Sequence, residues 1–305
     1  MVLRSENIQA ASQSRSELVS IGLPVRNGAG TLADVVKSVL AQDYEHLELV
    51  ISDNASTDVT EELCRELAAT DSRIVYHRQP QNIGLLGNFS QTVHLARGTF
   101  FRWLGDDDWI APNYISRCMD SFVSDSRLVL VTTQLTYVRP DGSDFTLEYA
   151  GKAFYSDDPI ERLEELITLI IRGNVPVDPL YGMARRACLA AIPRRNMIRE
   201  DEVFATRLTL AGPWAHLPEV LARRDLRDYG VATTARYLGV PMWQARVPTA
   251  VQCWEMLRFL RDEKMTNSQR RQAKVAVGRL FVGRHYATLK RRSKRLVELL
   301  LPLTK

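Results

Sequence analysis

Three adjacent carboxylates, Asp106, Asp107 and Asp108, are the residues of this chain best suited to chemistry. They follow the apolar stretch at residues 100–104, and carboxylates this close together repel one another unless a cation is present. Mg²⁺ and Mn²⁺ take oxygen ligands and complete their coordination with water and phosphate oxygens. This acidic triplet therefore predicts a metal–diphosphate site. A solvated acidic turn is the alternative, and the triplet alone leaves both open.

Four apolar runs rich in β-forming residues should position the triplet and three further polar segments. The expected strands cover residues 18–25, 47–51, 73–77 and 99–104. Helical periodicity separates them, and strands that are apolar on both faces indicate a mostly parallel sheet covered by helices. Ligands bind beyond the carboxyl ends of such strands, so the loops after them should converge at one edge. The loops carry Asn27, Asp53 with Asn54, Asn82 with Gly84, and the triplet.

The second half of the chain is less regular. A long strand is expected at residues 128–138 and a helix at residues 158–171. Glu200, Asp201 and Glu202 open another helix that ends at Gly212. Carboxylates are common in the first helical turn because they complement the helix dipole, so these three need no functional explanation on this ground alone. From about residue 229 the chain reads as helical and basic.

Composition excludes several classes of protein. The chain has 305 residues and a formal net charge of only +4, which is too weak to indicate nucleic-acid binding. The four cysteines are far apart, which favours reduced thiols in the cytoplasm. The first residues lack the apolar core of a signal peptide, and no apolar run reaches membrane-spanning length. The glycine patterns of dinucleotide-binding and phosphate-binding loops and the nucleophile elbow are also missing.

Taken in order and spacing, the motifs resemble those of family 2 glycosyltransferases. The segments that carry the resemblance are residues 19–27, 38–42, 50–58, 82–84, 103–109, 199–202 and 217–221. The match covers residues 18–225, and its motifs are specific only as an ordered set. It implies the GT-A fold, a Rossmann-like α/β architecture with a mostly parallel sheet flanked by helices, here followed by a C-terminal helical extension. It also implies a UDP- or dTDP-sugar donor, Mn²⁺ or Mg²⁺, and inversion at the anomeric carbon.

The resemblance also implies roles for single residues. Pro24 and Val25 would contact the base and ribose, and Asp53 would accept a hydrogen bond from the base. Of the triplet, Asp107 and Asp108 would lie on the metal side. The remaining donor-binding residues would be Asn27, Asn54, Asn82, Gly84, Asp106 and, again, Asp107. Asp201 would be the catalytic base and Glu200 the second candidate, because an attacking hydroxyl must lose a proton.

Structural explanations compete with several of these roles. Asp53 with Asn54 could form only a turn, and Trp103 and Trp109 are more typical of a core than of a sugar platform. Arg223 and Arg224 could reach the diphosphate, but exposed arginines are common. Two other functions stay open: a sugar nucleotidyltransferase, which would need a glycine-rich loop after the first strand, and a catalytically degenerate glycan-binding protein.

Four regions are expected. Residues 1–17 form a flexible leader, 18–125 the nucleotide-sugar-binding half, 126–228 the acceptor-side half, and 229–305 a basic helical region. The acceptor would be a glycan, a lipid-linked sugar or a small molecule. The basic run that includes Arg284, Lys290 and Arg295 precedes a leucine-rich end. This pattern suits either a helix docked on the catalytic domain or peripheral contact with the inner face of the plasma membrane.

Overall fold

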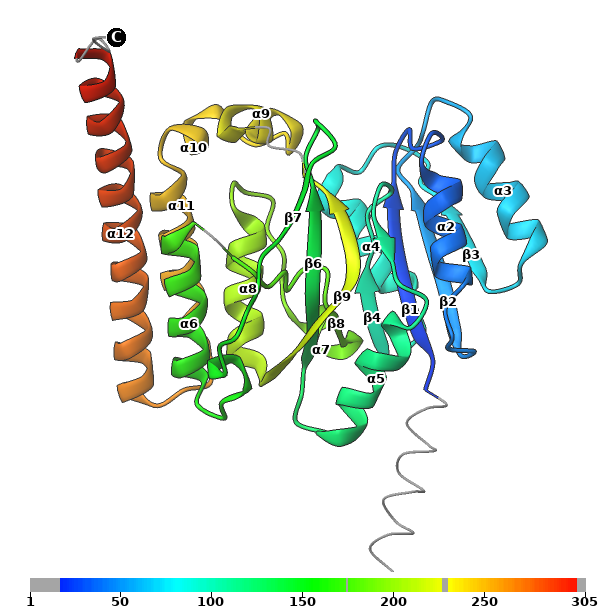
Figure 1. The fold of residues 1–305 in the computed structure, drawn as a ribbon, viewed down its shortest axis with the longest axis horizontal. Coiled ribbons are helices and arrows are strands. Elements are labelled where there is room, and N and C mark those ends of the chain that lie inside the picture. Colours follow the sequence, from blue (N-terminus) through cyan, green and yellow to red (C-terminus); the bar gives the residue numbers. More distant parts are fainter. Residues whose placement is uncertain (1–16, 174, 227–229, 301–305) are drawn as a thin grey trace, which may run out of the picture.

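A computed structural model describes residues 17–173, 175–226 and 230–300, with side chains up to residue 286. The expected leader therefore lies almost wholly outside the described residues. The described chain forms a nine-stranded sheet in the order β3-β2-β1-β4-β8-β6-β9-β5, with β7 paired to β6 (Figure 1). The strands are β1 Val19–Val25, β2 Leu47–Asp53, β3 Ile74–Arg78, β4 Phe100–Trp103, β5 Trp109–Ile110, β6 Leu130–Val138, β7 Asp144–Thr146, β8 Met183–Arg185 and β9 Trp214–Asp225.

The first four strands confirm the expected parallel arrangement. β1 pairs in parallel with β2 on one side and with β4 on the other, and β3 extends β2. Every residue of β1 and β2 is buried, as expected for strands with helices on both faces. Gly22 lets the neighbouring layer come close, because a Cβ there would lie 2.3 Å from the Phe101 ring and 2.8 Å from the Thr92 hydroxyl.

The sheet continues without a break into the second half of the chain. β8 is antiparallel to β4 and to β6, which restores the original direction in β6. β9 runs parallel to β6 and is antiparallel to the short β5. The sequence analysis identified β6 but not β9. β9 contains Pro218, and the pairing shifts so that Leu217 faces Thr133 while Val220 faces Gln134. A bulge of this kind accommodates a proline inside a strand.

Helices cover both faces of the sheet. One face packs against α2, α3 and α5 in a single apolar cluster, and the other packs against α4, α6, α8, α11 and α12. The helices are α2 Leu32–Leu40, α3 Thr60–Thr70, α4 Leu85–Leu95, α5 Tyr114–Ser124, α6 Pro159–Arg172, α7 Arg186–Ala191, α8 Glu200–Ala211, α9 Gly230–Tyr237, α10 Met242–Arg246, α11 Pro248–Phe259 and α12 Asn267–Leu300, with a 3₁₀ turn at Ala153–Tyr155. None of the helices in the described ranges has both the length and the apolar character needed to cross a bilayer.

The last helix, α12, docks on the body of the protein through its first half and lies at one side of the molecule (Figure 1). Ala273, Ala276, Val277 and Leu280 are buried, and a Cβ at Gly283 would come within 2.8 Å of Ile171 of α6. The expected helical extension is therefore present. Most of the basic run and the leucine-rich end lie beyond residue 286, outside the described side chains, so membrane contact through this region stays a prediction.

Arg102 of β4 is an unusual core residue. Its side chain is 0 % exposed and none of its three guanidinium nitrogens has a hydrogen-bond partner among the described residues. The guanidinium stacks 4.5 Å from the centre of the Tyr114 ring. Replacing a buried charge by an apolar side chain of similar volume is often stabilising, so Arg102→Met should raise the free energy of unfolding by about 1–4 kcal/mol. Urea unfolding measures this, and a less stable variant would contradict it.

Candidate active site

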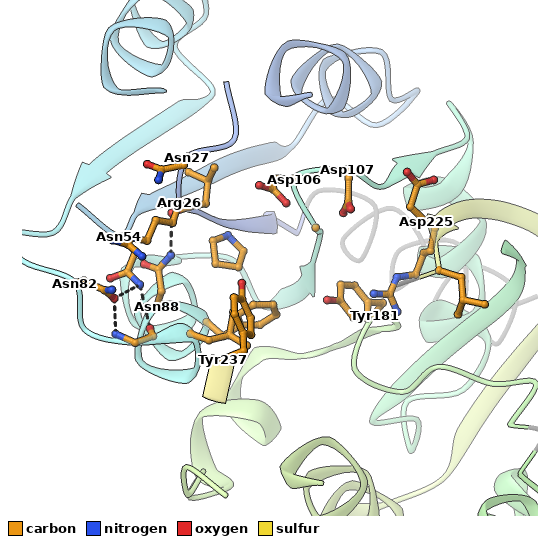
Figure 2. Close-up of a pocket in the computed structure, with 18 of the residues that line it drawn as sticks. Arg26, Asn27, Asn54, Asn82, Asn88, Asp106, Asp107, Tyr181, Asp225 and Tyr237 are labelled. Carbon is orange, nitrogen blue, oxygen red and sulfur yellow. Dashed lines mark hydrogen bonds between the residues drawn. The ribbon is translucent and has the colours of Figure 1, made fainter. Parts of the chain in front are cut away.

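A cavity of about 650 Å³ opens where the loops after β1, β2 and β4 meet the end of β9. We call it the triplet pocket, because Asp106 and Asp107 form part of its wall. Figure 2 shows the two aspartates between a group of asparagines on one side and Tyr181 with Asp225 on the other. The expected convergence of polar loops at one sheet edge is therefore observed. Its predicted members Pro24, Val25, Asn27, Asn54, Asn82, Gly84, Asp106 and Asp107 all line the cavity.

Hydrogen bonds between asparagines hold the loop after β3 against the carboxyl end of β2. The Asn54 amide donates to Asn82 Oδ1 at 2.9 Å and to the Gly84 carbonyl at 3.2 Å, while Asn54 Oδ1 accepts from the Ile83 N–H at 2.8 Å. Asn88 of α4 donates to the Ser52 carbonyl at 2.8 Å. These contacts keep the wall polar yet ordered, as a site that recognises a polar ligand requires.

Asp53 lies behind this wall and is 0 % exposed. Its Oδ1 accepts hydrogen bonds from the Ser56 N–H at 2.9 Å and from the Ser56 hydroxyl at 2.5 Å, and its Oδ2 accepts from the Tyr76 hydroxyl at 2.9 Å. Arg78 Nε lies 3.7 Å from the same carboxylate. The structure thus gives Asp53 a role in ordering the loop after β2. Its direct contact with a nucleobase stays a prediction.

The loop after β1 lies against the triplet through Gly28. A Cβ at this position would lie 2.7 Å from Asp106 Oδ2 and 2.6 Å from a Val25 methyl carbon. Next to it, Asn27 adopts a positive φ of 56°, and its Oδ1 accepts from the Thr57 N–H at 2.9 Å. Positive φ at a residue other than glycine is uncommon and is often found at ligand sites. The backbone here brings the Asp106 carboxylate close to Val25, one of the two predicted base and ribose contacts.

The three carboxylates of the triplet have different surroundings. Asp106 and Asp107 face the cavity, whereas Asp108 is 3 % exposed and accepts from the Gly105 N–H at 3.0 Å. Arg224 Nε lies 3.3 Å from both Asp108 oxygens. The expectation that Asp108 binds metal is untested and stays a prediction, although its carboxylate already has a cationic partner. The expectation for Asp107 also stays a prediction.

The carboxylates on the cavity wall suit a hard divalent ion. Asp106, Asp107 and Asp225 all line the triplet pocket. No group of three or more potential metal-binding side chains gathers within the described part of the chain. Mg²⁺ in nucleotide sites takes one or two carboxylates and fills its other positions with water and phosphate oxygens, so a large cluster is not required. The residues present therefore fit Mn²⁺ or Mg²⁺ bound together with a diphosphate.

Arg224, at the end of β9, is the central cation of the site. Its guanidinium stacks 3.5 Å from the centre of the Tyr181 ring, and Nη1 donates to Asp178 Oδ2 at 2.5 Å. The side chain thus bridges Asp178 and Asp108 while lining the cavity. The sequence analysis named Arg224 only as one of two candidate diphosphate contacts. The other candidate, Arg223, is exposed on β9 and does not line the cavity.

A second cavity of about 540 Å³ adjoins the first. Half of its lining residues are aliphatic, so we call it the aliphatic pocket. The two cavities share Leu85, Tyr137, Tyr181, Arg224 and Tyr237. Asp201, the predicted base, lies in the wall of the aliphatic pocket and not in that of the triplet pocket. The structure therefore places the two expected carboxylate sites in separate compartments with a common boundary.

The surroundings of Asp201 make its carboxyl a weaker acid. Although its surface is open to the cavity, the surrounding protein reduces its hydration, and this effect together with the negative charge of Glu202 raises the pKa of Asp201 to about 6. Glu200 and Asp178 add to the repulsion. A carboxylate with a raised pKa is a stronger base and can still be ionised at neutral pH. Such shifts are typical of catalytic carboxyls, although structural networks also produce them.

The two neighbours of Asp201 already have strong partners. Glu200 is 9 % exposed and forms a two-pronged ion pair with Arg194, whose Nε donates to Oε1 at 2.8 Å. Glu202 accepts from Gln252 at 2.6 Å and from Arg284 of α12 at 2.6 and 2.8 Å. This geometry favours Asp201 over Glu200 as the base. Both assignments stay predictions.

Several residues of the site were not found from the sequence. Arg26, Tyr137, Tyr181, Asp225 and Tyr237 line the triplet pocket, and four of them come from the second half of the chain. Tyrosines have no spacing signal that separates a pocket wall from a core. Asp225 could only have been found by locating the end of β9, whose proline-containing sequence hid the strand, and Tyr237 lies beyond it at the end of α9.

The sheet order and the acidic cavity at the carboxyl ends of its strands define a GT-A type of nucleotide-sugar fold. The sequence model described as Glycosyl transferase family 2 matches residues 20–174, just over half of the chain. The chain therefore belongs to Glycosyl transferase family 2. This confirms the expected family and fold.

Relatives of the chain include a hyaluronan synthase and a chondroitin synthase. The chain is 32% identical over 136 residues to a hyaluronan synthase of Pasteurella multocida and 31% identical over 140 residues to a chondroitin synthase of Escherichia coli. These alignments cover 45% and 46% of this chain but only 14% and 20% of the relatives, so the chain spans a small part of their length. A putative glycosyltransferase, EpsH, of Bacillus subtilis is 24% identical over 196 residues, covering 62% of this chain and 55% of EpsH.

Solved structures share the fold at low sequence identity. S. aureus TarS 1–349 in complex with UDP-GlcNAc matches with a TM-score of 0.62 at 16% identity, covering 88% of this chain and 73% of TarS 1–349. A mannosyltransferase from Pyrobaculum calidifontis, in complex with GDP-Man and Mn²⁺, matches with a TM-score of 0.52 at 13% identity, covering 94% and 97% of the two chains. These likenesses support the fold assignment alone.

Proposed function

We propose that this chain is an inverting, metal-dependent glycosyltransferase. It would move a sugar from a UDP- or dTDP-sugar donor to a hydroxyl group of a glycan, lipid-linked or small-molecule acceptor. One observation carries the proposal: Asp201, with its raised pKa, lies in a cavity that shares a wall with the acidic triplet pocket. Inversion needs this separation, because the leaving diphosphate and the attacking hydroxyl lie on opposite faces of the sugar.

Different residues of the two cavities would bind the donor, stabilise the leaving diphosphate and accept the proton. The asparagine wall and the Asp106 side of the triplet pocket bind the nucleotide part of the donor. Arg224 directs positive charge at the cavity, where a diphosphate gains negative charge as it leaves. Asp201 accepts the proton of the acceptor hydroxyl as this oxygen attacks the anomeric carbon. Of the two predicted metal residues, Asp107 faces the cavity and would hold the divalent ion, with Asp106 in place of Asp108 because Asp108 pairs with Arg224. When bound, the ion stabilises negative charge on the diphosphate without a proton.

Titration with UDP and turnover of UDP-sugars test the proposal directly. Calorimetric titration with UDP should show tighter binding in Mn²⁺ than in EDTA. UDP-GlcNAc, UDP-glucose and dTDP-glucose should be screened for release of nucleotide diphosphate in Mn²⁺, with water as the acceptor. If none of these nucleotides binds in either condition, the proposed transfer from a UDP- or dTDP-sugar is wrong. That outcome would favour a degenerate glycan-binding protein.

The cytoplasmic location of the chain is a separate prediction, which rests on the cysteine spacing.

The pH profile should report the ionisation of Asp201. A general base must be deprotonated, so kcat/KM should be level above pH 6 and fall about tenfold per pH unit below it. The same pKa shift makes folding stability fall over the pH range in which activity rises. The pKa of Asp201 in the folded protein lies above its unperturbed value of about 3.9. This carboxyl therefore favours folding below about pH 3.9, and its contribution to stability is lost as pH rises through about 6. A profile that stays level down to pH 4 would contradict Asp201 as the base.

A further inference from the structure

The aliphatic pocket carries more hydrocarbon side chains than the triplet pocket beside it. Its hydrocarbon lining comes from three elements that meet around Asp201. These residues are Leu166 and Ile170 of α6, Val175, Val177 and Leu180 of the segment before β8, and Ala205 of α8. A volume of about 540 Å³ is within the usual range for small-molecule sites. This pocket is thus large enough for more than the single hydroxyl group that the reaction needs.

Two of the three carboxylates of the aliphatic pocket are engaged with protein partners, and Tyr137, Tyr181, Tyr237 and Thr234 also belong to its polar lining. Asp178 accepts from Arg224 at 2.5 Å and from the Leu180 N–H at 3.2 Å. Glu202 is bound by Arg284 and Gln252. A sugar chain placed here would bury many hydroxyl groups against hydrocarbon, and each one left without a partner costs free energy. The hydrocarbon part of the lining therefore disfavours a long polar glycan, since only the tyrosines and Thr234 offer further hydroxyl groups to a sugar.

The carboxylates of the pocket wall further restrict the class of acceptor. The wall carries three carboxylates, those of Asp178, Asp201 and Glu202, and Arg224 already pairs with the first of them. A phosphate or carboxylate on the acceptor would meet like charge near Asp201. A neutral acceptor avoids this repulsion. Hydrocarbon walls around one carboxylate suit a molecule that offers a hydroxyl at one end and an apolar body behind it.

We propose that the aliphatic pocket binds the acceptor, and that this acceptor is a neutral alcohol or glycoside with an alkyl or aryl body beside the reacting hydroxyl. The proposal rests on the proposed transferase function, because it takes Asp201 as the base. It goes beyond that function by choosing among acceptor classes. The alkyl or aryl part would lie along the partly exposed Leu85, Val175 and Leu180, with the hydroxyl towards Asp201 and the shared wall.

The test compares methyl β-D-glucopyranoside with octyl β-D-glucopyranoside, used below its micelle concentration. Calorimetry or saturation-transfer NMR measures binding of each to the full chain, with and without UDP and Mn²⁺. The octyl glycoside should bind at least tenfold more tightly, because each buried methylene adds favourable transfer free energy. Equal affinities would overturn the proposal, whether or not either compound is glycosylated. A failure of the UDP titration instead overturns the transferase function, so the two failures are distinguishable.

Matched variants locate the binding site. Val175→Thr and Leu180→Thr each replace hydrocarbon by a hydroxyl at a partly exposed position of the pocket wall, so both should reduce the preference for the octyl compound several-fold. Val275→Thr makes the same exchange on α12 at a side chain that is 62% exposed, and it should leave the preference unchanged. Loss of the preference in Val275→Thr, with normal binding in the two pocket variants, would place the alkyl chain on the helical surface and overturn the proposal.

Discussion

Asp201→Asn is expected to lower the rate of sugar transfer by a factor on the order of 10²–10⁴, while UDP binding in Mn²⁺ changes little. The amide keeps the shape of the side chain but cannot accept a proton from the attacking hydroxyl. The variant should also unfold at a higher temperature at pH 7.5, by an amount equivalent to on the order of 1 kcal/mol after allowing for the open surface of Asp201. Transfer kinetics and thermal unfolding, measured on the same sample, report both effects.

Glu200→Gln is the matched control for this variant. It weakens the ion pair with Arg194 and should lower the unfolding temperature, because that pair is nearly buried. The transfer rate per folded molecule should stay within a few fold of the original. A normal rate in Asp201→Asn combined with an inactive Glu200→Gln would assign the base to Glu200.

Asp107→Asn should abolish the Mn²⁺-dependent part of UDP binding and reduce transfer by a factor on the order of 10³ or more, because a bound metal supplies several kcal/mol of charge stabilisation. The fold should tolerate the change, since Asp107 lies on the cavity wall. Removing one of three adjacent negative charges relieves repulsion in the metal-free protein. Calorimetric titration of UDP with Mn²⁺ and with EDTA measures the loss, and thermal unfolding checks the fold.

Asp108→Asn separates metal binding from structural support. Asp108 is buried and holds Arg224, so its amide variant should unfold at a lower temperature and disturb Arg224. It should keep most of the difference in UDP affinity between Mn²⁺ and EDTA. If Asp108→Asn instead loses that difference at unchanged stability, and Asp107→Asn keeps it, the metal is bound on the Asp108 side of the triplet.

The parallel half of the fold could be predicted because its signals are local. β1 and β2 are buried along their whole length and mostly apolar, and polar turns follow them after Val25 and Asp53. β9 could not be found in this way. It mixes tryptophan and alanine with Pro218 and several charged residues, and it becomes a strand only because β6 offers it a long partner with a bulge. Long-range pairing of this kind leaves little trace in a short window of sequence.

The candidate site could be predicted as a set of loops, but not as a set of side-chain directions. Adjacent residues in a turn point different ways, so the sequence could not show that Asp107 faces the cavity while Asp108 faces Arg224. Nor could it show that Asp53 binds Ser56 and Tyr76. The tyrosines of the shared wall come from distant segments, and only the folded chain brings them to one place.

The pairing of Arg284 with Glu202 has a practical consequence for work on shortened forms of the protein. A chain that ends before α12 reaches Arg284 would leave Glu202 without this cation, one residue from Asp201. The unneutralised charge would raise the pKa of Asp201 further and move the active pH range upward. If the shortened and full-length enzymes are compared at a single pH, a displaced pH optimum could then be mistaken for a loss of activity. Comparing them fairly requires the whole pH profile of each.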